Sequence, residues 1–164
     1  MNRRFWINRL LVLSLCLPFV QCIWRRTVTT QPAVTVKVVD AAGAPVAGAE
    51  VVVWWWSYPH SVVHERYAAS SGADGSAVFA GASKGETIAP LCMHGVPQHE
   101  HTVCVDVAGK GRGVVELEKS GETVTITLQP ADAGGAPPAN GRCEEFANEW
   151  KAKAAQAAPS SATP

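Results

Sequence analysis

The sequence predicts an all-β fold, an antiparallel β-sandwich of about seven or eight strands followed by a short C-terminal helix. Short apolar runs alternate with polar residues at the period of strands that bury one face. The 164 residues include 14 Gly and 11 Pro, which favour frequent turns. No amphipathic helix interrupts the strand patterns, so we expect one domain with a single core.

Residues 34–56 show the pattern most clearly, and we interpret them as the first hairpin of the sandwich. The first strand carries a valine at every second position: Val34, Val36 and Val38. Residues 40–49 are rich in Gly, Ala and Pro, which suit a turn. The extended run 50–56 follows as the second strand.

Three consecutive tryptophans end this second strand. If Trp55 points into the core, Trp54 and Trp56 share the outer surface, because successive side chains alternate. Exposed rings there would offer a carbohydrate or peptide platform. Alternatively, the lead-in segment, a neighbouring tyrosine or the C-terminal helix covers them, since Phe146 and Trp150 of that helix need a surface to pack on.

The later strands are separated by turn signals. We expect them at 62–67, 76–80, 84–93, 101–107, 113–118 and 122–128. The Asp74-Gly75 pair is a hairpin signal before the second of these. In the strand 101–107, Val103 and Val105 point inward and Cys104 points outward.

The first 22 residues are predicted to be a signal peptide or N-terminal anchor. A cationic start precedes an apolar run that is too short to cross a bilayer comfortably. Cys22 follows this run as in the lipobox of bacterial lipoproteins, so lipidation at Cys22 is one hypothesis. Cleavage by ordinary signal peptidase and retention as an anchor are the alternatives. All three place the domain outside the cytoplasm, in the cell envelope.

The remaining boundaries follow from composition. Residues 23–33 are predicted to be a tether, 34–129 the β-sandwich, 130–142 a flexible linker, 143–158 a short helix and 159–164 a disordered tail. The helix is expected because acidic residues come first and lysines later, with Phe146 and Trp150 at helical spacing.

Three segments carry a resemblance to a known family: 36–53, 71–79 and 84–88. Across roughly residues 34–129 the chain resembles the carboxypeptidase regulatory-like domain family, whose members are transthyretin-like or immunoglobulin-like β-sandwiches. The resemblance implies no catalytic residues and a role as an accessory, adhesive or stalk module. The Cys/His-rich stretch 92–104 departs from the family pattern.

Five cysteines are present, and two of them belong to the N-terminal segment. Cys92 and Cys104 are equidistant from Gln98, so a hairpin centred there predicts a disulfide between them. Such a bond would stabilise the fold by about 3 kcal/mol. Cys143 is then left free or available for an intermolecular disulfide.

A metal site competes with this disulfide for the same stretch. Imidazole and soft sulfur suit copper or zinc, and the two cysteines could act as thiolate ligands. A histidine-only site with the disulfide intact is the other version. Its ligands would be His94, His99 and His101. His60 and His64 are expected to be surface residues without a role.

The sequence predicts a non-enzymatic exported envelope protein, tethered to a membrane through its N-terminus, that acts through protein-protein or envelope-polymer contacts. No catalytic motif occurs and no cofactor is predicted. The zero formal net charge argues against nucleic acid as a partner. The alternatives are a periplasmic copper- or zinc-binding protein and a carbohydrate-binding module.

Overall fold

The computed structural model of the chain describes residues 24–88, 98–129 and 138–157. The predicted signal or anchor, with Cys22, and the predicted tail lie outside these residues. Within the described ranges, no helix combines the length and the apolar character needed to cross a membrane.

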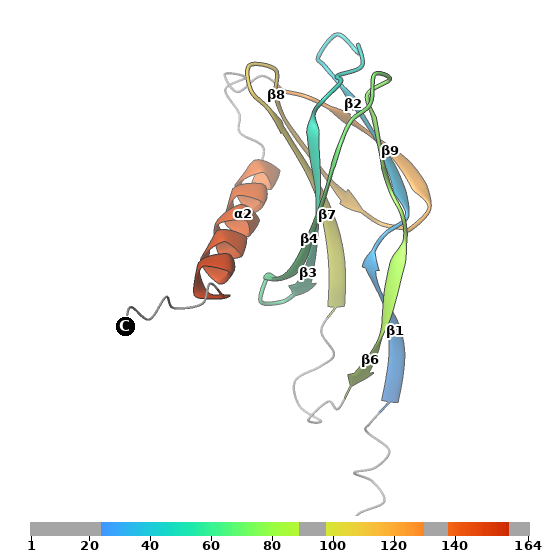
Figure 1. Cartoon of the computed structure of the whole chain (residues 1–164), viewed down its shortest axis with the longest axis vertical. Helices are drawn as coiled ribbons and strands as arrows, with labels where there is room; N and C mark the ends of the chain where they lie inside the picture. The colour runs from blue at the N-terminus through green and yellow to red at the C-terminus, as the bar shows by residue number, and fades with distance from the viewer. Residues whose placement is uncertain (1–23, 89–97, 130–137, 158–164) are drawn as a thin grey trace, which may run out of the picture. The chain divides into compact units, whose positions relative to one another are not determined.

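Most of the described chain forms β-strands, which confirms the predicted fold class. Seven of the strands are β2 (Val34–Val39), β3 (Glu50–Tyr58), β4 (Val62–Ser70), β5 (Ser76–Phe79), β7 (Gln98–Val107), β8 (Gly111–Leu117) and β9 (Glu122–Thr127). They form a three-stranded sheet, β5-β2-β9, and a four-stranded sheet, β4-β3-β7-β8 (Figure 1). One pair departs from the predicted antiparallel arrangement, because β2 and β9 run parallel.

The predicted first hairpin is wrong, because β2 and β3 lie in different sheets. β2 pairs with β5 and β9, whereas β3 pairs with β4 and β7. The segment 40–49 therefore crosses from one sheet to the other. Likewise β4 and β5 belong to different sheets, so the Asp74-Gly75 turn is a crossover and no hairpin.

The two crossovers hold each other in place by hydrogen bonds. The Ser71 hydroxyl donates to the Val46 carbonyl at 2.7 Å and accepts from the Ala49 amide at 2.9 Å. The Val38 amide donates to the Gly75 carbonyl at 2.8 Å. These bonds satisfy backbone groups where the chain leaves the sheets.

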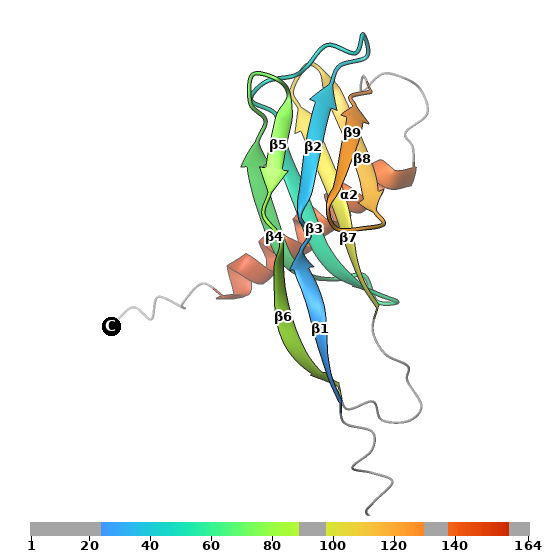
Figure 2. The same cartoon turned by 90° about the vertical axis from the view of Figure 1, so that its right-hand side faces the viewer.

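The main core lies between the two sheets and consists mostly of valines. The inward positions of β2 and β7 are those that the alternation predicts. The cluster includes Val34, Val36, Val38, Val51, Val53, Val103, Val105, Phe79, Ile126 and Leu128. Figure 2 shows the three-stranded sheet in front of the four-stranded sheet.

The remaining two strands, β1 (Trp24–Gln31) and β6 (Ala82–Ile88), form a two-stranded sheet. The predicted tether 23–33 is therefore largely a strand. Both strands cross the boundary between two compact units of the described chain: residues 24–28 with 83–88, and residues 29–82 with 98–129 and 138–157. In the first unit Arg26 forms an ion pair with Glu86 at 3.0 Å.

The C-terminal helix, α2 (Pro138–Ala157), is longer than predicted. It begins at Pro138, so residues 138–142 belong to the helix and not to the linker. Proline is common at the first helical position, because its fixed φ suits a helix and its missing N–H has no partner there.

Candidate functional site

Helix α2 covers the outer face of the four-stranded sheet, on the side away from the three-stranded sheet (Figures 1 and 2). Phe146 is fully buried, and its ring centroid lies 6.1 Å from that of Trp54 and 5.5 Å from that of Trp56. The ring of Trp150 lies 6.3 Å from that of Trp54. This aromatic cluster forms a second core beneath the helix.

The predicted platform on Trp54 and Trp56 is wrong, because each tryptophan is only 3% exposed. Coverage by the C-terminal helix, the alternative expectation, is confirmed. The indole N–H of Trp56 donates to the Thr102 hydroxyl at 3.0 Å, so this buried donor is satisfied. No flat aromatic surface remains there for a sugar ring.

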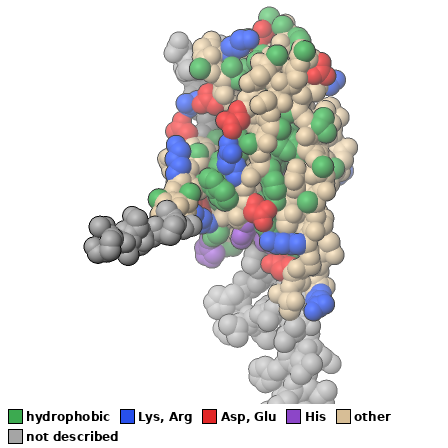
Figure 3. Space-filling model, in the orientation of Figure 1, with side chains coloured by type: hydrophobic (Ala, Val, Ile, Leu, Met, Phe, Trp, Pro, Cys, Tyr) green, Lys and Arg blue, Asp and Glu red, His purple; other side chains and the backbone are tan. Residues whose placement is uncertain are grey.

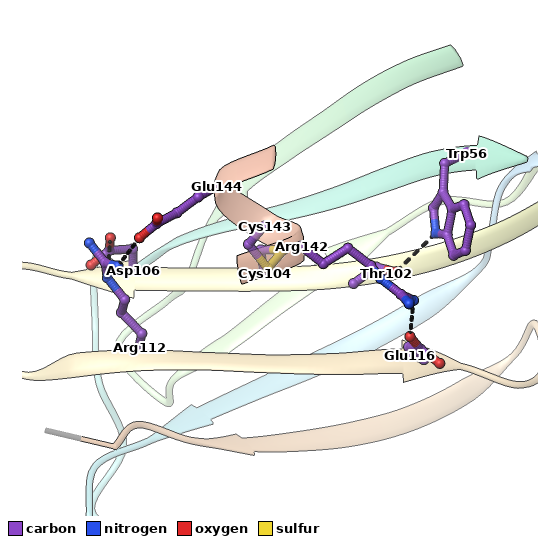
Figure 4. The surroundings of a disulfide bond; sticks show 9 residues. All are labelled: Trp56, Thr102, Cys104, Asp106, Arg112, Glu116, Arg142, Cys143 and Glu144. Atoms are coloured by element: carbon purple, nitrogen blue, oxygen red, sulfur yellow. Dashed lines mark hydrogen bonds and ion pairs between the residues drawn. A yellow bond between two sulfur atoms is a disulfide. The ribbon is translucent and has the colours of Figure 1, made fainter. Parts of the chain in front are cut away.

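A disulfide between Cys104 on β7 and Cys143 on α2 fastens the helix to the sheet, with the two Cα atoms 6.0 Å apart (Figure 4). The predicted Cys92–Cys104 pair is therefore wrong. So is the expectation that Cys143 is free or pairs with another chain. Cys92 lies outside the described residues.

The pairing of β7 explains why the predicted hairpin does not form. Cys104 lies opposite Val52 on β3 and opposite Val114 on β8. Because both edges of β7 are occupied there, the chain before Gln98 has no free edge on which to pair opposite Cys104. A signal for the correct partner was present, since Cys143, Phe146 and Trp150 fall on one helix face.

Charged side chains also join α2 to the sheet near the disulfide (Figure 4). Arg112 on β8 pairs with Glu144, and Arg142 pairs with Glu116. The Arg142 guanidinium also lies 5.0 Å from the centroid of the Trp56 ring. Exposed ion pairs contribute about 0–1 kcal/mol each. Aromatic burial and the disulfide therefore dominate the docking of the helix.

Side chains in the last turns of α2 form hydrogen bonds with backbone groups at the start of β4. The Lys153 ammonium donates to the Val63 carbonyl at 2.6 Å. The Val63 amide donates to the Glu149 carboxylate at 3.2 Å. The helix is thus held to the sheet along its length.

A groove of about 530 Å³ remains between α2 and the sheet. Its apolar lining includes Val52, Ala147, Trp150 and the two disulfide cysteines. Its charged residues are Glu50, Arg66, Asp106, Arg112, Glu144 and Lys151. Two of the cations are already paired, Arg66 with Glu50 and Arg112 with both Asp106 and Glu144. The groove can hold an apolar group between balanced charges. No pattern in the sequence predicts it, because its lining residues come from separate strands and from α2.

Histidines gather where β3 ends and β4 begins (Figure 3). The ring centroids of His64 and His99 lie 4.6 and 5.1 Å from that of Trp55, which is buried. His101 Nε2 lies 3.2 Å from the Thr30 carbonyl oxygen, to which the ring N–H can donate. Burial lowers the pKa of His101, which the Thr30 carbonyl partly offsets by favouring the charged form.

The thiolate version of the predicted metal site is wrong, because the sulfur of Cys104 is bonded to Cys143. The histidine-only version of the site has three predicted ligands. His99 and His101 lie on β7, whereas His94 lies outside the described residues. Among the side chains that the structure describes, no group of three or more His, Cys, Asp or Glu is placed to hold a metal ion.

The chain matches no protein-family model and no curated protein.

Proposed function

We propose that the chain is an exported, non-enzymatic module of the bacterial cell envelope, tethered through its N-terminal segment or through a lipid on Cys22, that acts by contact with another envelope protein. The Cys104–Cys143 disulfide carries this proposal. Disulfides persist outside the cytoplasm and are generally kept reduced inside it. A helix fastened by such a bond suits a protein that works in the periplasm or at the cell surface.

The groove beside α2 supports a polypeptide as the contacting partner. Its apolar lining suits an apolar side chain, and its six charged residues balance in sign. An anionic envelope polymer would favour a net positive surface. Figure 3 instead shows acidic and basic side chains interspersed on the face in view. A role as an accessory module also agrees with the resemblance to carboxypeptidase regulatory-like domains.

Export and tethering are tested by fractionating native host cells that produce the full chain. We expect the protein in the envelope fraction, with Cys104 and Cys143 protected from alkylation until a reductant is added. Intact mass then shows whether Cys22 carries a lipid or whether the N-terminal segment is retained. Recovery from the cytoplasm with both thiols reactive would overturn the proposal.

The contact surface is tested by photo-crosslinking from α2. A benzophenone side chain replaces Ala147, which lines the groove, or Ala152, an exposed alanine of the same helix outside the groove lining. We expect a discrete product with one envelope protein from position 147 and not from position 152. No product from position 147, or the same product from both positions, contradicts a contact in the groove.

A further inference from the structure

One end of the groove beside α2 carries an excess of negative charge. This end lies over β7 and β8, where Asp106 is opposite Arg112 in the strand register. The Nε atom of Arg112 lies 2.9 Å from a carboxylate oxygen of Asp106, and the same guanidinium pairs with Glu144 of α2 (Figure 4). Because two carboxylates share one guanidinium, this end keeps a negative charge that no lining cation neutralises.

The other end of the groove carries an excess of positive charge. It lies over β3 and β4, where Arg66 forms an ion pair with Glu50 at 2.5 Å. The Arg66 guanidinium lies 5.9 Å from the centroid of the Trp54 ring, which Trp150 of α2 also contacts. Lys151 follows Trp150 and lines the groove, and among the described residues its ammonium has no ion-pair partner. A second cation is therefore present at this end beside one carboxylate.

Helix α2 sets the distance between the two charged ends. Glu144 and Lys151 are seven residues apart, which is two turns, so they lie on one face of the helix and about 10 Å apart along its axis. Ala147 and Trp150 line the groove between them, and Val52 of β3 adds to the apolar lining. The groove therefore has an apolar centre between a negative end and a positive end.

We propose that the groove binds a segment of a partner polypeptide in which an apolar side chain lies between a basic and an acidic residue about 10 Å apart. The basic residue lies beside Asp106 and Glu144, and the acidic residue lies beside Lys151. This inference rests on the proposed protein contact and adds the chemistry of the segment that makes it. A segment with charges of one sign would meet like charge at one end, so the groove selects against it.

The first part of the test identifies the segment. The product that forms from the benzophenone at position 147 in native host cells is digested, and mass spectrometry locates the crosslinked residue in the partner. We expect an apolar stretch with a basic residue on one side and an acidic residue on the other. That stretch is then synthesised with a fluorescent label and titrated with the full chain, isolated with its disulfide intact.

The second part reverses one charge in the groove. Lys151→Glu is expected to weaken binding of the labelled peptide by at least about fivefold, whereas Lys151→Arg should bind like the wild type. A peptide in which lysine replaces the acidic residue should bind Lys151→Glu more tightly than it binds the wild type. The matched control is Lys110→Glu, which makes the same change in net charge at an exposed lysine of the β7–β8 turn and should leave binding unchanged.

The outcomes separate this inference from the contact on which it rests. No product from position 147 overturns the contact and this inference together. A product whose segment lacks the two opposite charges overturns this inference alone. So does a Lys151→Glu variant that binds the peptide as tightly as the wild type, or a Lys110→Glu variant that loses as much affinity. An unfolding midpoint in urea near that of the wild type shows that each variant is folded.

Discussion

At the scale of single residues, the crossover between the sheets depends on Gly75. Its φ is +76°, and a Cβ there would lie 2.6 Å from the Val38 carbonyl oxygen. Gly75→Ala is therefore expected to destabilise the fold by about 1–3 kcal/mol, measured by urea unfolding. Gly43 is the matched control, because its φ is +82° but a Cβ there would meet no atom within 4 Å. Gly43→Ala should cost less, and equal losses would contradict the predicted clash.

Asp74 makes the same turn sensitive to acid. Its carboxylate accepts a hydrogen bond from the Ser76 amide at 3.0 Å, which lowers the pKa of Asp74 below its ordinary value of 3.8. A lowered folded-state pKa stabilises the fold above pH 3.8, and this contribution is lost as pH falls through the folded-state pKa. Asp74→Ala should therefore lower the urea midpoint at neutral pH but not in strong acid. A difference that persists in strong acid would exclude this cause.

Some residue roles can be predicted from sequence and others cannot. The inward valines follow from alternation, because a strand exposes its two faces in turn. The partner of Cys104 does not follow from spacing, since it depends on which strands flank β7 and on where α2 docks. The contact of His64 with Trp55 does not follow from the sequence either, because a bulge leaves no clear trace in a single sequence.

At the scale of elements, the strand patterns predict which residues are buried but not which strands pair. A period of two marks a face in either sheet, so the β2–β3 connection reads equally well as a hairpin or as a crossover. The C-terminal helix was predictable because its aromatic residues share one face. Its start at Pro138 was not, because residues 138–142 have the composition of a linker.

The docking of α2 depends on Phe146, which is fully buried against Trp54 and Trp56. Phe146→Ala is expected to destabilise the fold by about 3–5 kcal/mol, because it leaves a cavity beneath the helix. Tryptophan emission should also shift to the red as Trp54 and Trp56 meet water. Val78→Ala is the control, since Val78 is 70% exposed and should cost little. An unchanged emission maximum in Phe146→Ala would contradict this packing.

At the scale of the whole molecule, the disulfide joins residues 39 positions apart and restricts the unfolded chain. Loop closure of that length is worth about 4 kcal/mol on the chain-entropy estimate. The double variant Cys104→Ala/Cys143→Ala should lose about that much stability to urea. Cys92→Ala, in contrast, should unfold like the wild type. If Cys92→Ala lost stability to urea and Cys143→Ala did not, a bond between Cys92 and Cys104 would be favoured instead.

Mapping the disulfide in the full chain recovered from native host cells tests most directly whether α2 is fastened to β7. Trypsin alone leaves Cys92 and Cys104 in one peptide, because no Lys or Arg lies between them, but cleavage after Glu100 separates them. Digestion at both kinds of site, followed by mass spectrometry without reduction, identifies the partner of Cys104. We expect a peptide containing Cys104 linked to one containing Cys143. A Cys92–Cys104 link, or free thiols at Cys104 and Cys143, would contradict it.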